Sequence, residues 1–459
     1  MSTSSSTSTP AKVSFVLSLT VLAFLGGFMT RWHEWFPNEY LENASAQATQ
    51  VRKQWSDTPL DLESRVYDRS GTQLFDSSAA QSGLTLITSA WPHPETGILT
   101  PGAKLLDHQG RVVHEWLPDR TALFPEADLR GGNPRTAFFH GAHLMPDGDL
   151  VLALNYIGMV RLDACGTVEW TMTESNHHSI TRANDGTFWV PGVSSTRRAK
   201  TQNHPNGFPG LEHPVWLDRL LHVSPKGEIL QDINMLDVLY ENGLERYVRK
   251  AYAEGAYHPD NGDPTHLNDI EPLAPSVADE YPLFDAGDLL LSLKHPNLVL
   301  VLDPESRTVK WHTDSSPRDN YHLLQQHDPD FMGNGWIGIF DNREDFTDRG
   351  TMLGGSRILA FQPHTDSVDV LFPPSGSDSI YTRNRGKWQF LENGNRLIVE
   401  SNPGRVLEVT PSGKPVWEWI HPPYDQTRVP PVTGAYRHDL THEDVASWPC
   451  SNLKAPMAQ

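Results

Sequence analysis

The stretch MPDGDLVLALNYIGMVRLDACGTVEW, residues 145–170, decides the fold class of this chain. It runs from an Asp-Gly turn through a β-rich segment, a second strand and a second turn, and it ends on a tryptophan. A turn of this kind joins strands that can pair only as neighbours. The stretch therefore predicts an antiparallel meander.

The same pattern occurs six times after residue 82. The copies are LTLITSA with GAKLLDHQGRVVHEW (ending at 116), residues 145–170, RANDGTFWVPG (182–192) with LLHVSPKGEIL (220–230), residues 286–311, GNGWIGIFDN with SRILAFQPHTDSVDVLF, and residues 392–419. A single meander cannot bury both of its faces, whereas radial stacking of meanders does so and leaves only short edges. We expect an all-β fold, a six-bladed β-propeller of four-stranded antiparallel blades over residues 83–424, with residues 425–459 as a C-terminal tail.

The composition agrees with many short strands and limits the partners. Among 459 residues there are 36 prolines, 34 glycines and 14 tryptophans, a mixture that favours turn-rich β-structure over long helices. Four tryptophans close repeats and are expected to pack between blades, namely Trp116, Trp170, Trp311 and Trp417. The net charge of −20 argues against nucleic-acid binding, because neutralising phosphates requires a basic surface.

The N-terminal region predicts attachment to a membrane. A polar tail, residues 1–12, precedes the uncharged run Val13–Thr30, which has about the length that a helix needs to cross a bilayer. We expect a transmembrane anchor here, followed by a stalk or linker over residues 31–82. A cleaved signal peptide is the alternative, although its candidate cleavage site at Ala44-Ser45-Ala46 lies far beyond the apolar run.

Two cysteines, Cys165 and Cys450, are too few for a disulfide scaffold or a cysteine-rich metal protein. They could pair in an oxidising compartment and tie down the C-terminal tail, but separation in sequence does not tell their distance in space. The sequence therefore leaves their pairing open.

A histidine precedes the first turn of four successive repeats: His143, His178, His266 and His327. The first strand of a propeller blade lines the central channel, so equivalent positions of successive blades converge near one mouth of it. These imidazoles could serve as structural partners of buried carbonyls or as reactive groups. Neither a His-x-x-x-His helix motif nor a cysteine partner accompanies these histidines to indicate a zinc site. The sequence also contains no recognisable cofactor motif.

Several motifs together resemble the bacterial arylsulfotransferase family. They are HHSITRANDG, HLNDIEPL, DLLLSLKHPNLVLVLD, QQHDPDFMGNGWIGIFDN, GGSRILAF and FLENGNRLIVESNPGRVLEVTPSGKPVWEW, in this order. The resemblance covers roughly residues 84–421. It implies a six-bladed propeller, exported or membrane-associated, that moves a sulfuryl group from a phenolic sulfate to another phenol without a nucleotide donor. The expected partners are therefore a small aromatic sulfate, a phenol and the membrane, with the propeller on the periplasmic or exported side of a bacterium.

The resemblance also implies site residues. His266 in the His-x-Asn motif, His327 in the Gln-His-Asp motif and Arg357 in the Ser-Arg motif match positions that bind and polarise the sulfate group. His178 joins them as a catalytic candidate, and the substrate-binding candidates are His143, Asn268, Arg383 and Arg385. Sulfuryl transfer places negative charge on oxygens, so Arg and protonated His would stabilise the transition state, while a neutral His could act as nucleophile or general base.

One departure from the family concerns the last repeat. Active members use a further histidine near the end of the propeller as covalent nucleophile, whereas the last repeat here begins YTRNRGKWQFLENGN, residues 381–395, without histidine. His178, His266 or His327 would have to replace it. Otherwise the chain is a degenerate membrane-anchored propeller that binds or scaffolds a partner. A quinone-dependent or metal-dependent oxidoreductase has less support.

Arg357 discriminates between these alternatives. A sulfate site requires Arg357 and at least two histidines directed at one spot, whereas pairing of Arg357 with Asp341 would weaken the enzyme hypothesis. The segment RKAYAEGAYHPDNGDP, residues 249–264, is expected to be either a lid over the channel or a static insertion.

Overall fold

A computed structural model describes residues 9–32, 62–125, 137–211, 213–253, 262–313 and 321–450. The chain divides into two compact units, residues 1–59 and 60–459, which are described separately. Of the predicted lid segment, residues 254–261 lie outside the described part.

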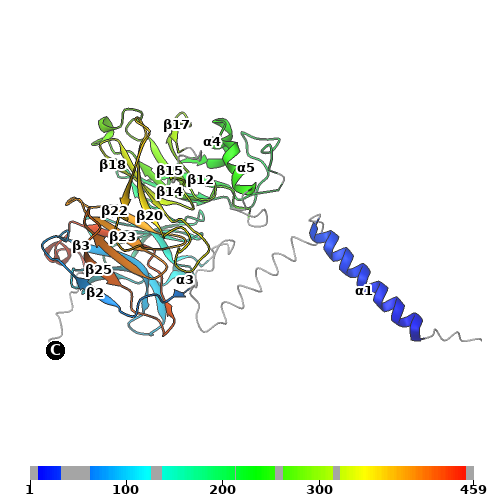
Figure 1. Cartoon of the computed structure of the whole chain (residues 1–459), viewed down its shortest axis with the longest axis horizontal. Coiled ribbons are helices and arrows are strands. Elements are labelled where there is room, and N and C mark those ends of the chain that lie inside the picture. The colour runs from blue at the N-terminus through cyan, green and yellow to red at the C-terminus, as the bar shows by residue number, and fades with distance from the viewer. Residues whose placement is uncertain are drawn as a thin grey trace, which may run out of the picture. The chain divides into compact units, whose positions relative to one another are not determined.

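The first unit contains the helix α1 (Thr9–Trp32) (Figure 1). Its central run Val13–Thr30 has a mean hydropathy of 2.0 and none of it is buried. Eighteen helical residues span about 27 Å, close to the thickness of the hydrocarbon core of a bilayer. The helix is thus consistent with a membrane anchor or, since it lies near the N-terminus, with a signal sequence.

The second unit is the predicted six-bladed β-propeller, built from six antiparallel sheets. Five blades contain four strands each. In order from the inner strand outward they are β27 (Gly434–His438), β3 (Leu84–Pro92), β4 (Leu99–Leu106) and β5 (Val112–Trp116); β6 (Phe139–Leu144), β7 (Leu150–Leu154), β8 (Gly158–Leu162) and β9 (Val168–Met172); β10 (Thr181–Arg182), β11 (Phe188–Val193), β12 (Asp218–Val223) and β13 (Ile229–Asn234); β14 (Leu267–Pro272), β15 (Leu289–Leu293), β16 (Leu298–Asp303) and β17 (Thr308–His312); β18 (His327–Gly333), β19 (Trp336–Asp341), β20 (Arg357–Gln362) and β21 (Ser367–Phe372). The six repeats recognised in the sequence fall in the six blades in order.

The sixth blade carries an additional outer strand from the N-terminal side of the propeller. It contains β22 (Lys387–Phe390), β23 (Arg396–Glu400), β24 (Arg405–Val409) and β25 (Pro415–Ile420), and β2 (Gly71–Leu74) pairs with β25. Segments from the two ends of the propeller sequence therefore lie side by side (Figure 1). A short sheet of β1 (Glu63–Ser64) and β26 (Arg428–Val429) adds a second connection. Residues 62–74, which the sequence analysis assigns to a linker, are thus attached to the propeller.

The C-terminal region closes the ring. Strand β27 lies in the stretch 425–459 that the sequence analysis treats as a tail, yet it is the innermost strand of the first blade, with Gly434 opposite Thr88. It is followed by helix α6 (His442–Ala446), and Cys165 and Cys450 form a disulfide bond with a Cα–Cα distance of 5.3 Å. Short outer helices complete the described elements: α3 (Arg120–Leu123), α4 (Met235–Glu241), α5 (Glu245–Ala253) and the 3₁₀ helix η1 (Ala278–Glu280).

Hydrophobic side chains of neighbouring blades pack against one another, as the strand patterns predict. Strands such as β7, β15 and β23 are buried along their whole length, because sheets cover both of their faces. Trp116 and Trp417 are fully buried in these clusters, while Trp170 and Trp311 pack against them partly buried. In the repeat that decides the fold, Gly148 has a φ of +91° and a Cβ there would lie 2.6 Å from the Trp448 ring. The turn therefore requires glycine for both conformation and space.

Candidate functional site

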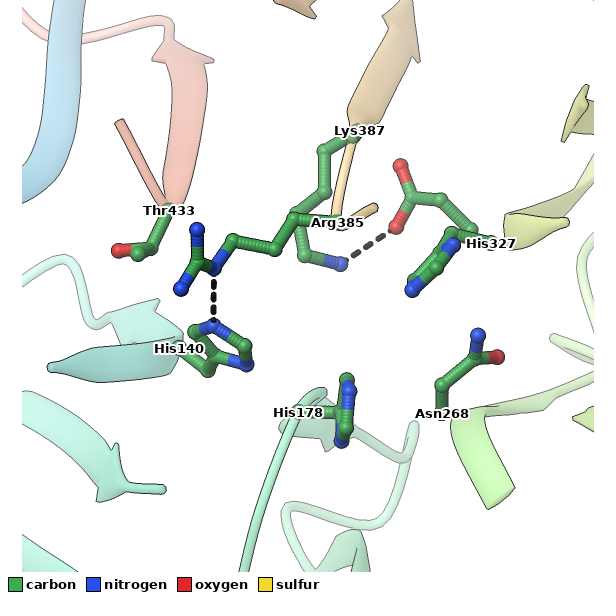
Figure 2. Close-up of a pocket in the computed structure, with 9 residues that line it drawn as sticks. His140, His178, Asn268, His327, Arg385, Lys387 and Thr433 are labelled. Atoms are coloured by element: carbon green, nitrogen blue, oxygen red, sulfur yellow. Dashed lines mark hydrogen bonds and ion pairs between the residues drawn. The ribbon is translucent and has the colours of Figure 1, made fainter. Parts of the chain in front are cut away.

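All six blades contribute to one cavity where their inner strands begin. It is lined by Thr433, His140, His178, Asn268, His327 with Asp328, and Arg385 with Gly386 and Lys387, in blade order (Figure 2). Each residue belongs to an inner strand or to the loop that leads into it. A propeller places these equivalent positions around one axis, so residues far apart in sequence meet there.

The tautomer of His327 follows from its hydrogen bonds. Its Nδ1 lies 3.0 Å from the backbone oxygen of Gln325 and 2.7 Å from Oδ1 of Asn342. A carbonyl oxygen can only accept, so Nδ1 carries the proton. The Asn342 amide is oriented by donating to the backbone oxygens of Thr382 and Arg385. The Nε2 of His327 therefore has a free lone pair, and this other ring nitrogen faces the cavity (Figure 2).

Burial keeps His327 neutral. It lowers the pKa of His327 well below its ordinary 6.5, and the positive charges of Lys294 and then His266 and Lys387 add to this effect, while the hydrogen bond to Asn342 opposes it. The same cause lowers the pKa of His140 and of His178. At neutral pH these imidazoles are hydrogen-bonding groups and potential nucleophiles and not fixed cations.

The fixed positive charge of the cavity comes from Arg385 and Lys387. Arg385 donates from Nε to Nε2 of His140 (3.1 Å), and its Nη1 lies 3.1 Å from the carboxylate of Glu63 (Figure 2). The Nε2 lone pair of His140 is thereby occupied. Glu63 also approaches Arg383 at 3.3 Å, so a strand from the N-terminal side of the propeller places a carboxylate beside a cavity arginine.

Lys387 is held by Asp328, whose Oδ1 is 2.5 Å from Nζ (Figure 2). Burial alone would lower the pKa of Lys387, but the negative charge of Asp328 outweighs it and raises that pKa, so Lys387 stays protonated. Further carboxyl groups lie close by. Burial raises the pKa of Asp269 to about 7 and that of Glu271 and Asp330 well above the usual range, because the ionised forms lose hydration.

Two further histidines, His177 and His266, contact the cavity residue His178. Nδ1 of His178 is 2.6 Å from Nδ1 of His177, so one of these rings donates to the other. The ring of His266 lies 5.2 Å from that of His178, and its Nδ1 is 2.5 Å from the carboxylate of Asp263. The carboxylate can only accept, so Nδ1 of His266 carries a proton.

Asp263, His266 and His295 offer three potential ligand atoms within 4.8 Å of one another, the composition of a metal site. These atoms already have protein partners, because His266 bonds to the Asp263 carboxylate and Nδ1 of His295 to the Asp263 backbone oxygen at 2.6 Å. Lys294 adds positive charge that acts on Asp263. The surroundings therefore favour a hydrogen-bonded carboxylate–imidazole group over a divalent cation.

The structure brings together four of the eight site residues named from the sequence. His178, His327, Asn268 and Arg385 line the cavity, and His266 lies next to His178. Asn268 donates from Nδ2 to the backbone oxygen of Gln326, while its buried Oδ1 has no hydrogen-bond partner in the described part of the chain. An unpaired buried acceptor of this kind is costly unless a ligand supplies a donor.

The other three lie elsewhere. His143 is three residues along β6 from His140 and packs near Phe188, because side chains alternate between the two faces of a strand. Arg357 lies on β20, the third strand of its blade, where its Nε donates to Asp341 at 2.8 Å and its Nη2 to the backbone oxygen of His322. This is the pairing that weakens the enzyme hypothesis as drawn from the sequence, and the cations that do line the cavity are Arg385 and Lys387. Arg383 is 56% exposed and faces Glu63.

Sequence reasoning missed His140, Lys387 and Thr433. His140 stands in FFHGAH beside the chosen His143, and only the register of β6 separates the two. Lys387 and Thr433 carry no distinctive motif. The φ angles of His178 (+55°), His266 (+48°) and Arg385 (+60°) are left-handed, a conformation that is uncommon for residues other than glycine and that cannot be read from a sequence.

The family model described as arylsulfotransferase (ASST) matches residues 142–421, well over half of the chain. The chain belongs to the arylsulfotransferase family. This member of the family has an arginine and a lysine in the cavity from its last blade, where the sequence contains no histidine. The family membership indicates an arylsulfotransferase-like function in general terms.

Solved structures similar to this chain share little sequence with it. A protein of unknown function from Bacteroides caccae is 11% identical, with a TM-score of 0.46, over 76% of this chain and 99% of that one. A streptogramin B lyase is 12% identical, with a TM-score of 0.38, over 76% and 87% of the two chains. They carry no argument about function. A comparison with curated proteins gives no match.

Proposed function

We propose that this protein transfers a sulfuryl group from an aryl sulfate to a phenol through a covalent intermediate on Nε2 of His327. The observation that carries the proposal is the hydrogen bonding of His327, whose Nδ1 proton is held by Gln325 and Asn342 while Nε2 faces two cationic side chains. A neutral imidazole with a directed lone pair is a nucleophile, and nearby fixed cations attract a sulfate ester.

The donor sulfate is expected to lie between Arg385, Lys387 and His178. Negative charge on the non-bridging oxygens is shared with fixed N–H donors that need little rearrangement, which is the main source of stabilisation in such transfers. Arg385 is oriented by His140 and Glu63, and Lys387 is oriented by Asp328. Their remaining N–H groups are available to a ligand.

The transfer takes two displacement steps. In the first, the Nε2 lone pair of His327 attacks sulfur, a nitrogen–sulfur bond forms, the bond from sulfur to the aryl oxygen breaks, and the phenolate leaves with its electron pair. In the second, the oxygen of the acceptor phenol attacks the same sulfur and the nitrogen–sulfur bond breaks, which returns His327 to its starting form. The acceptor loses one proton and the leaving phenolate gains one, so no external reactant is needed.

The acceptor phenol finds a partner in Asn268. Its buried Oδ1 has no hydrogen bond to the described residues, and it suits the hydroxyl donor of a phenol better than a sulfate oxygen, which can only accept. Asp263 with His266 and Asp341 with Arg357 stand behind the cavity. We assign them to positioning the loops that carry His178 and His327.

The disulfide supports a location of the propeller in an oxidising compartment. Cys165 and Cys450 are joined, and such bonds persist mainly outside the cytosol. With α1 as a membrane anchor, the propeller would lie on the exported side. This localisation is part of the proposal.

The test is release of 4-nitrophenol from 4-nitrophenyl sulfate by the full chain in detergent, with and without added phenol. Phenol-dependent release is expected, together with loss of about 10³-fold or more in His327→Ala. His143→Gln is the matched control, because this histidine also lies on an inner strand, where it is half-buried, but outside the cavity. Arg357→Ala is included to test whether Arg357 positions the loop that carries His327 or binds the sulfate group directly.

Mass spectrometry of the protein mixed with donor alone should find the sulfuryl group on His327. A sulfuryl group on His178 or His266 would overturn the assignment of the nucleophile but not the reaction. Sulfate-ester binding without any turnover by a folded protein would overturn the enzyme hypothesis and favour a propeller that only binds anions.

A further inference from the structure

One loop of the propeller exposes two large apolar side chains. It connects β19 to β20, and we call residues 343–355 the rim loop. Phe346 and Met352 in this loop are 93% and 76% exposed. In the part of the chain that the structure describes, no other large apolar side chain is as exposed, and the highest value within α1 is 72%. The rim loop therefore presents apolar surface that the propeller itself does not cover.

The exposure does not result from a loose loop. Oδ1 of Asp345 accepts from the backbone N–H (3.0 Å) and the hydroxyl (2.6 Å) of Thr347. Its Oδ2 accepts from the backbone N–H groups of Met352 (2.8 Å) and Leu353 (2.9 Å). One carboxylate thus ties both ends of the turn together next to Phe346. We call Phe346, Met352 and the 39% exposed Leu353 the apolar tip, because they gather around this carboxylate. Neighbouring exposed apolar side chains of this kind indicate a contact surface.

The rim loop lies on the side of the propeller where the cavity is. Asn342, directly before the loop, donates to the backbone oxygen of Arg385 at 2.8 Å. Within the loop, Gly350 packs so closely against the ring of Tyr381 that a Cβ would not fit there. The described part of the propeller also begins on this side, because Glu63 of β1 pairs with Arg385. The apolar tip is therefore next to the segment that carries the cavity arginine.

The size and shape of the apolar tip favour a bilayer over other occupants. A small-molecule subsite is concave, whereas the tip protrudes, and its residues do not line the cavity. Three side chains of this size cover up to about 600 Å², less than the roughly 800 Å² per partner of a stable protein interface. A second copy of the chain is therefore not held by this surface alone. The helix α1 is consistent with a membrane anchor, so a bilayer is an apolar phase to which this chain has access.

We propose that the apolar tip inserts into the interfacial region of the bilayer that holds α1, and that the cavity side of the propeller faces this membrane. Insertion buries the Phe346 ring and the Met352 side chain about 5–10 Å deep, at the boundary of headgroups and acyl chains. The net charge of −20 opposes attraction to anionic lipids, so the contact is apolar and not electrostatic. The inference rests on α1 as the anchor proposed above, and it is independent of the transfer chemistry.

The experiment places a nitrobenzoxadiazole label on single cysteines of the full chain in phosphatidylcholine nanodiscs. Cys165 and Cys450 are joined and are the only cysteines of the chain, so an introduced cysteine is the only free thiol. Thr351→Cys puts the label on an exposed position beside Met352. Ser412→Cys is the matched control, because Ser412 is also an exposed hydroxyl residue of a turn, but it lies between β24 and β25, at the opposite end of the strands. Quenching by lipids with a nitroxide on the upper acyl chain is measured.

We expect quenching at Thr351→Cys to be at least about twice as strong as at Ser412→Cys, since only the first label lies at the depth of the nitroxide. Adding Phe346→Ser and Met352→Ser should remove this quenching without lowering the thermal unfolding midpoint. Equal quenching at the two positions, or quenching that survives loss of the tip, overturns the proposal. Ala23→Cys in α1 tests the anchor separately. Quenching there without quenching at Thr351→Cys overturns the docking alone, whereas no quenching at Ala23→Cys overturns the anchor and the docking together.

Discussion

Asn342 and His327 are joined by a 2.7 Å hydrogen bond that determines which nitrogen of the imidazole faces the cavity. The asparagine cannot turn its amide around, because its Nδ2 donates to two backbone oxygens of the last blade. Asn342, in the loop after β19, thus fixes the tautomer of His327 in the same blade, and the last blade holds the Asn342 amide in place. This arrangement can supply a directed nucleophile although the last blade has no histidine there.

Replacing Asn342 should impair turnover more than binding. Asn342→Leu leaves the Nδ1 proton of His327 with only the Gln325 oxygen, and we expect kcat to fall by about 10-fold to 100-fold, the usual effect of losing an orienting partner, with a smaller change in KM. Asn342→Asp places a negative charge beside the ring. It should raise the pKa of His327 and move the acid limb of the pH–rate profile upward.

Asn203→Ala is the control for Asn342, because Asn203 is a polar surface residue that bonds to Glu241. Identical pH profiles of Asn342→Asp and the parent chain would contradict the role given to this pair.

Removing the charge of Glu63 should strengthen the binding of donor. Its carboxylate competes with a sulfate ester for Arg385, so Glu63→Gln is expected to lower the KM for 4-nitrophenyl sulfate by about threefold to tenfold, with little change in kcat. Steady-state kinetics at two salt concentrations measure this. Glu115→Gln is the matched control, because Glu115 is more exposed and pairs with Lys104. A higher KM in Glu63→Gln would mean that Glu63 orients Arg385 and does not compete with the ligand.

The pH dependence of activity follows from the buried imidazoles. Burial depresses the pKa of His327 below 6.5 in the folded protein, so the ring remains neutral as the pH falls through 6.5 and becomes protonated only at lower pH. We therefore expect kcat/KM for the donor to stay level from pH 7 to below 6.5 before it declines. A decline that is already half complete at pH 6.5 would show that His327 titrates like an exposed histidine.

Stability should also fall with acidification, because of half-buried histidines such as His143 and His438, whose pKa is lowered to about 4 by loss of hydration. The unfolded chain binds protons at these rings from about pH 6.5 downward and the folded chain does not, so their contribution is complete above 6.5 and is lost toward pH 4. Asp269 acts in the opposite direction. Burial raises its pKa to about 7, so the folded protein binds this proton more tightly than the unfolded chain and gains stability as the pH falls below 7. The denaturant midpoint of His143→Gln should therefore depend less on pH than that of the parent chain.

The disulfide should stabilise the C-terminal region and not the cavity. Cys450 follows Trp448, which packs against Trp116 and His114 of the first blade, while β27 closes the ring without help from the bond. We expect Cys165→Ser with Cys450→Ser to cost about 2–4 kcal/mol of stability and to leave kcat nearly unchanged. Thermal unfolding and 4-nitrophenol release on the same sample check this. A large loss of activity in a folded variant would contradict the separation.

The sequence by itself determined the elements and their number. Asp-Gly turns between apolar runs specify local antiparallel pairing, and a repeat that cannot bury its own faces must stack with copies of itself, so six repeats predict six blades. The order of motifs identified the family, which the match over residues 142–421 confirms. His178, Asn268, His327 and Arg385 could be found for the same reason, since they stand where inner strands begin.

Tertiary structure alone decided the register and the partners. His140 faces the cavity and His143 does not, because side chains alternate along β6 and its exact register depends on packing against neighbouring blades. Arg357 was expected at the sulfate, but it is bonded to Asp341 on the third strand of its blade. Glu63 contacts Arg385 because the N-terminal side of the propeller closes on the last blade, and Asn342 contacts His327 from the loop after β19. The contact of Glu63 joins positions hundreds of residues apart, and local propensity carries no information about it.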